Sequence, residues 1–121
     1  MFLKLQKLTF ILVSLCPAIS GAEKLGFNSD VRPILSDHCF TCHGFDSNAR
    51  EADLRLDTAE GAFSKRESGQ AIVPGDLAGS LVWQRIITDD PDDVMPPADH
   101  CLKLDEKDKA LLKRWNEEGA P

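Results

Sequence analysis

The stretch Cys39-Phe40-Thr41-Cys42-His43 places two thiols three residues apart and an imidazole directly after the second. Residues i and i+3 of a helix lie on the same face, so we expect the sulfurs of Cys39 and Cys42 to point toward one common partner. The ring of His43, fixed beside the second thiol, then faces that partner as well. The identity of the partner depends on which other ligands the chain offers.

A C-x-x-C pair serves as a redox disulfide, as half of a zinc site or, when His follows, as the attachment point of a haem. A zinc site needs two further ligands at similar local spacing. The remaining candidates are His38, His100 and Cys101. They form no second C-x-x-C or H-x-x-x-H pair, so the sequence favours one covalently attached haem c. In that interpretation Cys39 and Cys42 form the thioethers and His43 binds the iron.

The first 22 residues have the anatomy of a secretory signal peptide. Lys4 and Lys7 precede an apolar run over residues 8–15, and small residues follow up to Ala22. The run is much shorter than the roughly 20 apolar residues of a membrane helix. We therefore predict a leader over 1–22, cleavage after Ala22, and export to the periplasm or another extracytoplasmic compartment of a bacterium, without stable membrane insertion. Lipidation at Cys16 is the alternative.

The segment left after cleavage, residues 23–121, is long enough for one small domain that buries about 60–70% of its unfolded surface. Loss of Lys4 and Lys7 changes the formal charge from −6 to −8. Such a negative domain is not expected to bind nucleic acid, and it favours a redox partner protein that is basic or neutral at the contact.

The pattern of apolar residues and capping signals predicts an all-α domain of about four helices with long loops. The first helix is expected to run into the Cys39 motif, with Asn28, Ser29 or Asp30 as its N-cap and Pro33 in its first turn. Its predicted core stripe consists of Val31, Ile34 and Leu35.

Three further helices are expected downstream. Leu54 and Leu56 predict an extended piece with one buried side, followed by a short helix at Thr58–Phe63 that Thr58 caps. A third helix follows Pro74-Gly75, with Asp76 or Ser80 as its cap. Its predicted apolar face consists of Leu81, Val82, Ile86 and Ile87.

The last helix is expected to begin at Asp105, with Asp108 three residues on, and to end before Gly119. Its predicted apolar face consists of Ala110, Leu111, Leu112 and Trp115.

Four residues have two interpretations each. Arg55 reaches a haem propionate or pairs at the surface, and Trp83 packs on the haem edge or in the ordinary core or rim. His38 is a ligand or a solvated or capping side chain. Cys101, unpaired in the haem interpretation, is a functional thiol or a partly buried small residue in a loop.

Met95 is the candidate for the second axial ligand, because no other methionine remains after the leader is removed. It precedes Pro96 and Pro97, which stiffen the chain behind it. A thioether ligand raises the potential of a haem relative to two imidazoles. A methionine that fills a gap in the core is the alternative role. His100 is the rival ligand and would give a lower potential.

The order of these elements resembles a small class I type cytochrome c, in which the first and last helices cross beside the haem. More narrowly, four blocks resemble the planctomycete-type cytochrome c domain: VRPILSDHCFTCHG, ADLRLDTAEGA, IVPGDLAGSLVWQRI and DDPDDVMPPADHCLKLDEKDKALLKRWNEEGA. They cover nearly all of residues 27–120 in the same order.

The resemblance implies that Cys39 and Cys42 attach the haem, that His43 is the proximal ligand and that Met95 is the distal ligand. Among the possible functions, the sequence favours an electron carrier over an enzyme. A di-haem peroxidase would need a second C-x-x-C-H, which the chain lacks. Members of this family often carry the domain at the front of large exported proteins. The alternative function is therefore a haem-based sensor or a docking module in a longer chain.

Overall fold

The structure is a computed structural model that describes residues 14, 17–18, 21 and 23–121. The predicted leader lies almost entirely outside the described residues, as do Cys16 and the expected cleavage point at Ala22. In the part of the chain that is described, no helix combines the length and the apolar content that crossing a membrane requires.

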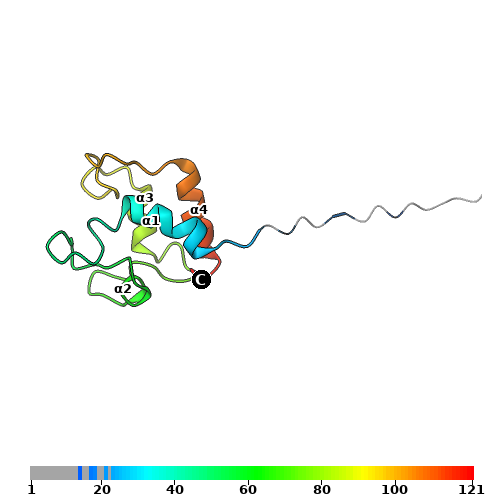
Figure 1. Cartoon of the computed structure of the whole chain (residues 1–121), viewed down its shortest axis with the longest axis horizontal. Coiled ribbons are helices and arrows are strands. Elements are labelled where there is room, and N and C mark those ends of the chain that lie inside the picture. Colours follow the sequence, from blue (N-terminus) through cyan, green and yellow to red (C-terminus); the bar gives the residue numbers. More distant parts are fainter. Residues whose placement is uncertain (1–13, 15–16, 19–20, 22) are drawn as a thin grey trace, which may run out of the picture.

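The described chain contains four α-helices and one π-helical turn, and none of the described residues forms a strand. The turn η1 (Phe27–Val31) leads directly into α1 (Arg32–His38), followed by α2 (Ala59–Phe63), α3 (Leu81–Ile87) and α4 (Glu106–Glu117). Long connections join α1 to α2 and α3 to α4 (Figure 1). The architecture confirms the predicted all-α class.

The N-terminal helical segment starts earlier than predicted. Gly26, and not Asn28, Ser29 or Asp30, is the cap of η1, and no side chain caps it from outside. Asp30 instead reaches back from within the turn, where its Oδ2 accepts a hydrogen bond from the Gly26 N–H at 2.8 Å. Pro33 lies in the first turn of α1 as expected. The predicted core stripe is buried: Val31, Ile34 and Leu35.

The last helix begins and ends as predicted. The side chain of Asp105 accepts a hydrogen bond from the Asp108 N–H at 2.8 Å, which satisfies one of the free donors of the first turn. Gly119 follows the helix end with a φ of +97°, a conformation that favours glycine.

The buried face of α4 differs in part from the predicted one. Leu112 and Trp115 are buried and Leu111 is half-buried, but Ala110 is exposed. The buried position that pattern reasoning missed is Asn116, which follows Trp115. Its amide has hydrogen-bond partners in a distant loop, so a polar side chain is tolerated there.

The first and last helical elements pack against each other. The rings of Phe27 and Trp115 have centroids 5.7 Å apart, and Nη2 of Arg114 donates a hydrogen bond to the Glu23 carbonyl at 2.5 Å. The indole N–H of Trp115 donates to the Pro121 carbonyl at 3.0 Å. These contacts tie both described ends of the domain to α4.

The short helix in the middle of the chain is formed as predicted. The hydroxyl of Thr58 caps α2 by accepting a hydrogen bond from the Gly61 N–H. Leu56, in the extended piece before it, is buried, whereas Leu54 is half-buried.

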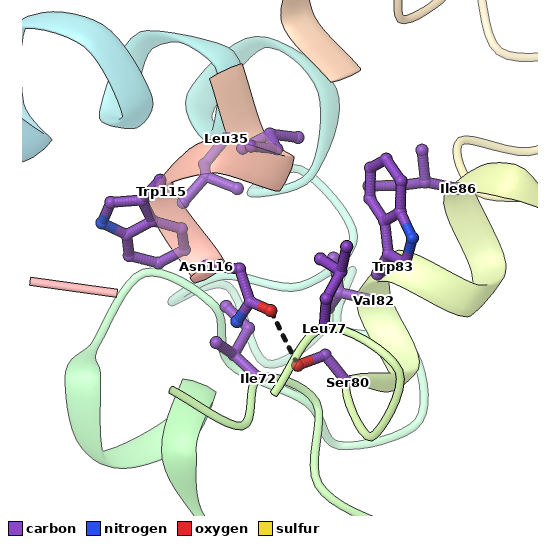
Figure 2. Close-up of a pocket in the computed structure, with 10 residues that line it drawn as sticks. Leu35, Ile72, Leu77, Ser80, Val82, Trp83, Ile86, Trp115 and Asn116 are labelled. Atoms are coloured by element: carbon purple, nitrogen blue, oxygen red, sulfur yellow. Dashed lines mark hydrogen bonds between the residues drawn. The ribbon is translucent and has the colours of Figure 1, made fainter. Parts of the chain in front are cut away.

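Ser80 precedes α3, but its hydroxyl makes no cap. It donates to the Asp76 carbonyl at 2.8 Å, accepts from the Val73 N–H at 2.9 Å and lies 3.3 Å from Oδ1 of Asn116 (Figure 2). Ser80 therefore joins the loop before α3 to α4. Ile87, which was predicted on the apolar face of α3, is 54% exposed, whereas its neighbour Ile86 is buried.

Candidate functional site

The Cys39 motif forms a turn of its own after α1. The backbone of Cys39 leaves the helical region at φ −127°, so α1 ends at His38 and the prediction of a continuous helix was wrong. A new turn follows, in which the His43 N–H donates to the Cys39 carbonyl at 2.9 Å. This turn places the two cysteines in the lining of one cavity, as their spacing predicted.

That cavity has a volume of about 250 Å³ and is the larger of two described hollows, the other measuring about 20 Å³. Its walls come from the Cys39 motif, the extended piece before α2, α3 and the loop after α3. Nine of its 19 lining residues are aliphatic: Ala52, Leu54, Leu56, Leu81, Val82, Ile86, Pro96, Pro97 and Leu104. An apolar cavity with a few convergent polar groups is the usual form of a cofactor site.

His43 presents one ring nitrogen to a carbonyl and leaves the other free. Its Nδ1 lies 3.2 Å from the Glu51 carbonyl, and Nε2 has no hydrogen-bond partner in the described part of the chain. Burial lowers the pKa of His43, and the hydrogen bond to Glu51 opposes that effect only in part. The imidazole is therefore neutral at pH 7, which is the state that binds a metal.

The two cysteines are free thiols and are not joined by a disulfide. Burial, with a smaller effect from the neighbouring Cys42, raises the pKa of the Cys39 thiol to about 12. Without a cofactor this thiol stays protonated at neutral pH. No three His, Cys, Asp or Glu side chains in the described ranges lie close enough together to hold a metal ion.

Met95 lines the same cavity as Cys39, Cys42 and His43. Its backbone N–H donates to the Arg85 carbonyl at 2.9 Å, which anchors the residue to the end of α3. The peptide bond to Pro96 is cis.

The rival ligand His100 also lines the large cavity. Its backbone N–H donates to the Pro97 carbonyl at 2.9 Å. All the side chains that the sequence predicted to attach the haem or to bind its iron thus line one cavity.

Two of the residues that had two interpretations each do not line this cavity. Arg55 pairs with Asp57, Nη2 to Oδ2 at 2.7 Å, so its surface interpretation is the one that the structure supports. The hydrogen bond from Arg55 lowers the pKa of Asp57. Trp83 lines the 20 Å³ cavity together with Trp115, where it is an ordinary half-buried tryptophan (Figure 2).

His38 and Cys101 both differ from expectation. The side chain of His38 is only 9% exposed, with Nδ1 3.1 Å from the Leu102 carbonyl and Nε2 3.6 Å from Oδ2 of Asp108, so it is not solvated. It is a lining residue of the large cavity. Cys101 is exposed and not partly buried.

Arg66 is a charged residue of the cavity lining that the sequence patterns did not indicate. It lines the cavity and donates hydrogen bonds to the carbonyls of Ala52 and Asp53, two residues with positive φ. Arg66 lies in a polar loop after α2 with no periodic pattern around it. The only signal available was a cation downstream of the motif, and Arg55 met that description equally well.

The turn from Cys39 to His43 lines this cavity, and η1 and α4, the first and last helical elements, pack together. This is the arrangement of a c-type cytochrome. The family model described as Planctomycete cytochrome C matches residues 39–99, half of the chain, and the chain therefore belongs to this family. Membership implies a covalently bound haem. Domains of this class are typically extracytoplasmic.

The match contains Cys39, Cys42, His43 and Met95 but neither α1 nor α4. Neither the search of curated proteins nor that of solved structures found a match.

Proposed function

We propose that this chain is an exported electron carrier that holds one haem c through Cys39 and Cys42, with His43 and Met95 as axial ligands. One observation carries the proposal: both axial candidates line the same apolar cavity as the two attachment thiols. Two thiols, a neutral imidazole and a thioether are the donor set that haem c requires. The described residues therefore fit the cofactor.

The bound haem would supply one-electron Fe(III)/Fe(II) chemistry. The protein's contribution is to hold the two donors and to exclude water. The Glu51 carbonyl fixes the ring of His43, and the anchor at Arg85 fixes the backbone of Met95. If His43 and Met95 both bind the iron, it would have no open site for a substrate, so we propose a carrier and not an enzyme.

Arg66 is one of two arginines that line the cavity, and it is proposed to pair with a haem propionate. The other lining arginine, Arg85, is already paired with Asp93, Nη1 to Oδ1 at 2.6 Å.

The negative charge of the domain, −8 after the expected cleavage, supports a redox partner that is basic or neutral at the contact and argues against nucleic acid. Further domains of a longer chain are an additional candidate partner. Export through the leader at 1–22 is part of the same proposal.

The ligand assignment is tested on the protein matured with haem. A thioether bound to ferric iron gives a weak near-infrared band, and a closed site binds carbon monoxide slowly and weakly. Met95→Ala should abolish that band. Wild-type protein that lacks the band, or that binds carbon monoxide fully at micromolar concentration, would contradict a His/Met carrier. The mature N-terminus, expected at Glu23, tests export.

A further inference from the structure

The chain has three histidines, and all three line the large cavity. They differ in what their ring nitrogens contact. A histidine that binds a metal uses one nitrogen for the metal and almost always donates its other N–H to a carbonyl, a carboxylate or water. The contacts of each ring therefore indicate which of the three is set up as a ligand.

His38 has no free nitrogen. Nδ1 lies 3.1 Å from the Leu102 carbonyl, and Nε2 lies 3.6 Å from the carboxylate of Asp108. Binding iron would require breaking one of these contacts, so His38 is the least suitable of the three.

His100 has the same pattern as the proximal candidate His43. Its Nδ1 lies 2.9 Å from the Leu102 carbonyl and 3.1 Å from the Leu102 N–H, whereas Nε2 has no partner among the described residues. In the tautomer that donates from Nδ1 to the closer carbonyl, Nε2 carries a lone pair. His43 has the equivalent contact from Nδ1 to the Glu51 carbonyl at 3.2 Å.

The segment that joins Met95 to His100 is anchored at several points. The backbone N–H of Met95 bonds to Arg85, and that of His100 bonds to the Pro97 carbonyl. Nζ of Lys103 donates to the carbonyls of Pro97, at 3.3 Å, and Ala98. These contacts hold a thioether and an imidazole at the same cavity, five residues apart in one loop.

We infer that His100 is a reserve ligand: it binds the haem iron through Nε2 whenever Met95 does not. This inference rests on the proposed function. The loop then offers two alternative distal donors, used one at a time. Because an imidazole lowers the potential of a haem relative to a thioether, exchange of the donors changes the potential without opening the iron to external ligands.

The test is the Met95→Ala variant matured with haem, with retention of one covalent haem confirmed by mass. We expect its ferric form to stay six-coordinate and low-spin, with an electron paramagnetic resonance spectrum of two nitrogen ligands. Its potential should be lower than that of the wild type, and carbon monoxide should still bind slowly. The double variant Met95→Ala/His100→Ala should be high-spin and should bind carbon monoxide readily.

The matched control is Met95→Ala/His38→Ala, which removes the cavity histidine whose two nitrogens are both engaged. It should remain low-spin. The inference is overturned if Met95→Ala alone is already high-spin and matches the double variant, or if the His38 control opens the site. In either case the wild-type near-infrared band still supports the His/Met carrier. A wild type without that band, altered by His100→Ala alone, overturns both proposals.

Discussion

The two cavities meet at α3, where Val82 and Ile86 contribute to both linings. Mostly apolar side chains line the 20 Å³ cavity. Its two polar lining residues, Ser80 and Asn116, are hydrogen-bonded to each other and to backbone groups of the protein. The 250 Å³ cavity contains ligand atoms that have no partner among the described residues, among them Nε2 of His43. The small cavity is thus part of the packed protein core. The large cavity on the other side of α3 has the form of a cofactor site.

The largest effect is expected from the cysteines of the large cavity. Replacing Cys39 and Cys42 together by Ser removes both thioether bonds, so the mass increase of one haem should be lost and acidified organic solvent should extract all pigment. Cys101→Ser is the control and should keep its haem, because this thiol is exposed outside the lining. Covalent haem in the double variant would refute the attachment.

Substitutions in the two cavities should have different effects. One in the small cavity should mainly lower the free energy of unfolding, and one in the large cavity should mainly change the haem absorption spectrum. Leu35 lines the small cavity and is 1% exposed. Leu35→Ala should lower the free energy of unfolding by about 2–5 kcal/mol, with little change in the haem spectrum. Leu54→Ala, at the half-buried wall of the large cavity, should cost less but shift the haem absorption. Denaturant unfolding measures the free energy, and visible spectra measure the haem absorption. If the two variants had the same effects on stability and on absorption, the proposed difference between the cavities would be wrong.

The polar contact across the small cavity should contribute less than the aliphatic packing. Asn116→Ala removes two hydrogen bonds, one with Ser80 and one with the Val73 carbonyl, and should lower the free energy of unfolding by about 1–3 kcal/mol. Lys107→Ala, on an exposed position of the same helix, is the control and should change it by no more than about 0.5 kcal/mol. A similar cost in both variants would show that the network is unimportant.

The smallest effect is expected at the surface pair of Arg55 and Asp57. Because the folded protein lowers the pKa of Asp57, the pair stabilises the fold above the ordinary aspartate pKa of 3.8, and this contribution is lost as the pH falls through the lower folded value. Arg55→Gln should therefore lower the melting temperature slightly at pH 6 and leave it unchanged at the acid end. Equal losses at both pH values would contradict this linkage.

Local signals in the sequence predicted the parts of the fold that depend on neighbouring residues. The caps of Thr58 and Asp105, and the glycine after α4, each involve residues within one or two turns. The motif from Cys39 to His43 was predictable for the same reason. The sequence did not predict that this motif forms a separate short turn, because that turn depends on where the backbone of Cys39 leaves the helix.

The misses involve contacts between residues far apart in the chain. The burial of Asn116 depends on a loop 43 residues earlier, and that of His38 on a carbonyl 64 residues later. Arg66 reaches carbonyls 13 and 14 residues away, in a loop with positive φ at two non-glycine residues. Periodicity carries no information about such contacts.

The small cavity also has an optical consequence. The chain has two tryptophans and no tyrosine, and both indoles, Trp83 and Trp115, line this cavity. Intrinsic fluorescence therefore comes from the packed side of α3, whereas visible absorption would come from the cofactor side. One unfolding experiment can follow both signals, and coincident transitions would show that the two sides of the domain lose their structure as one cooperative unit.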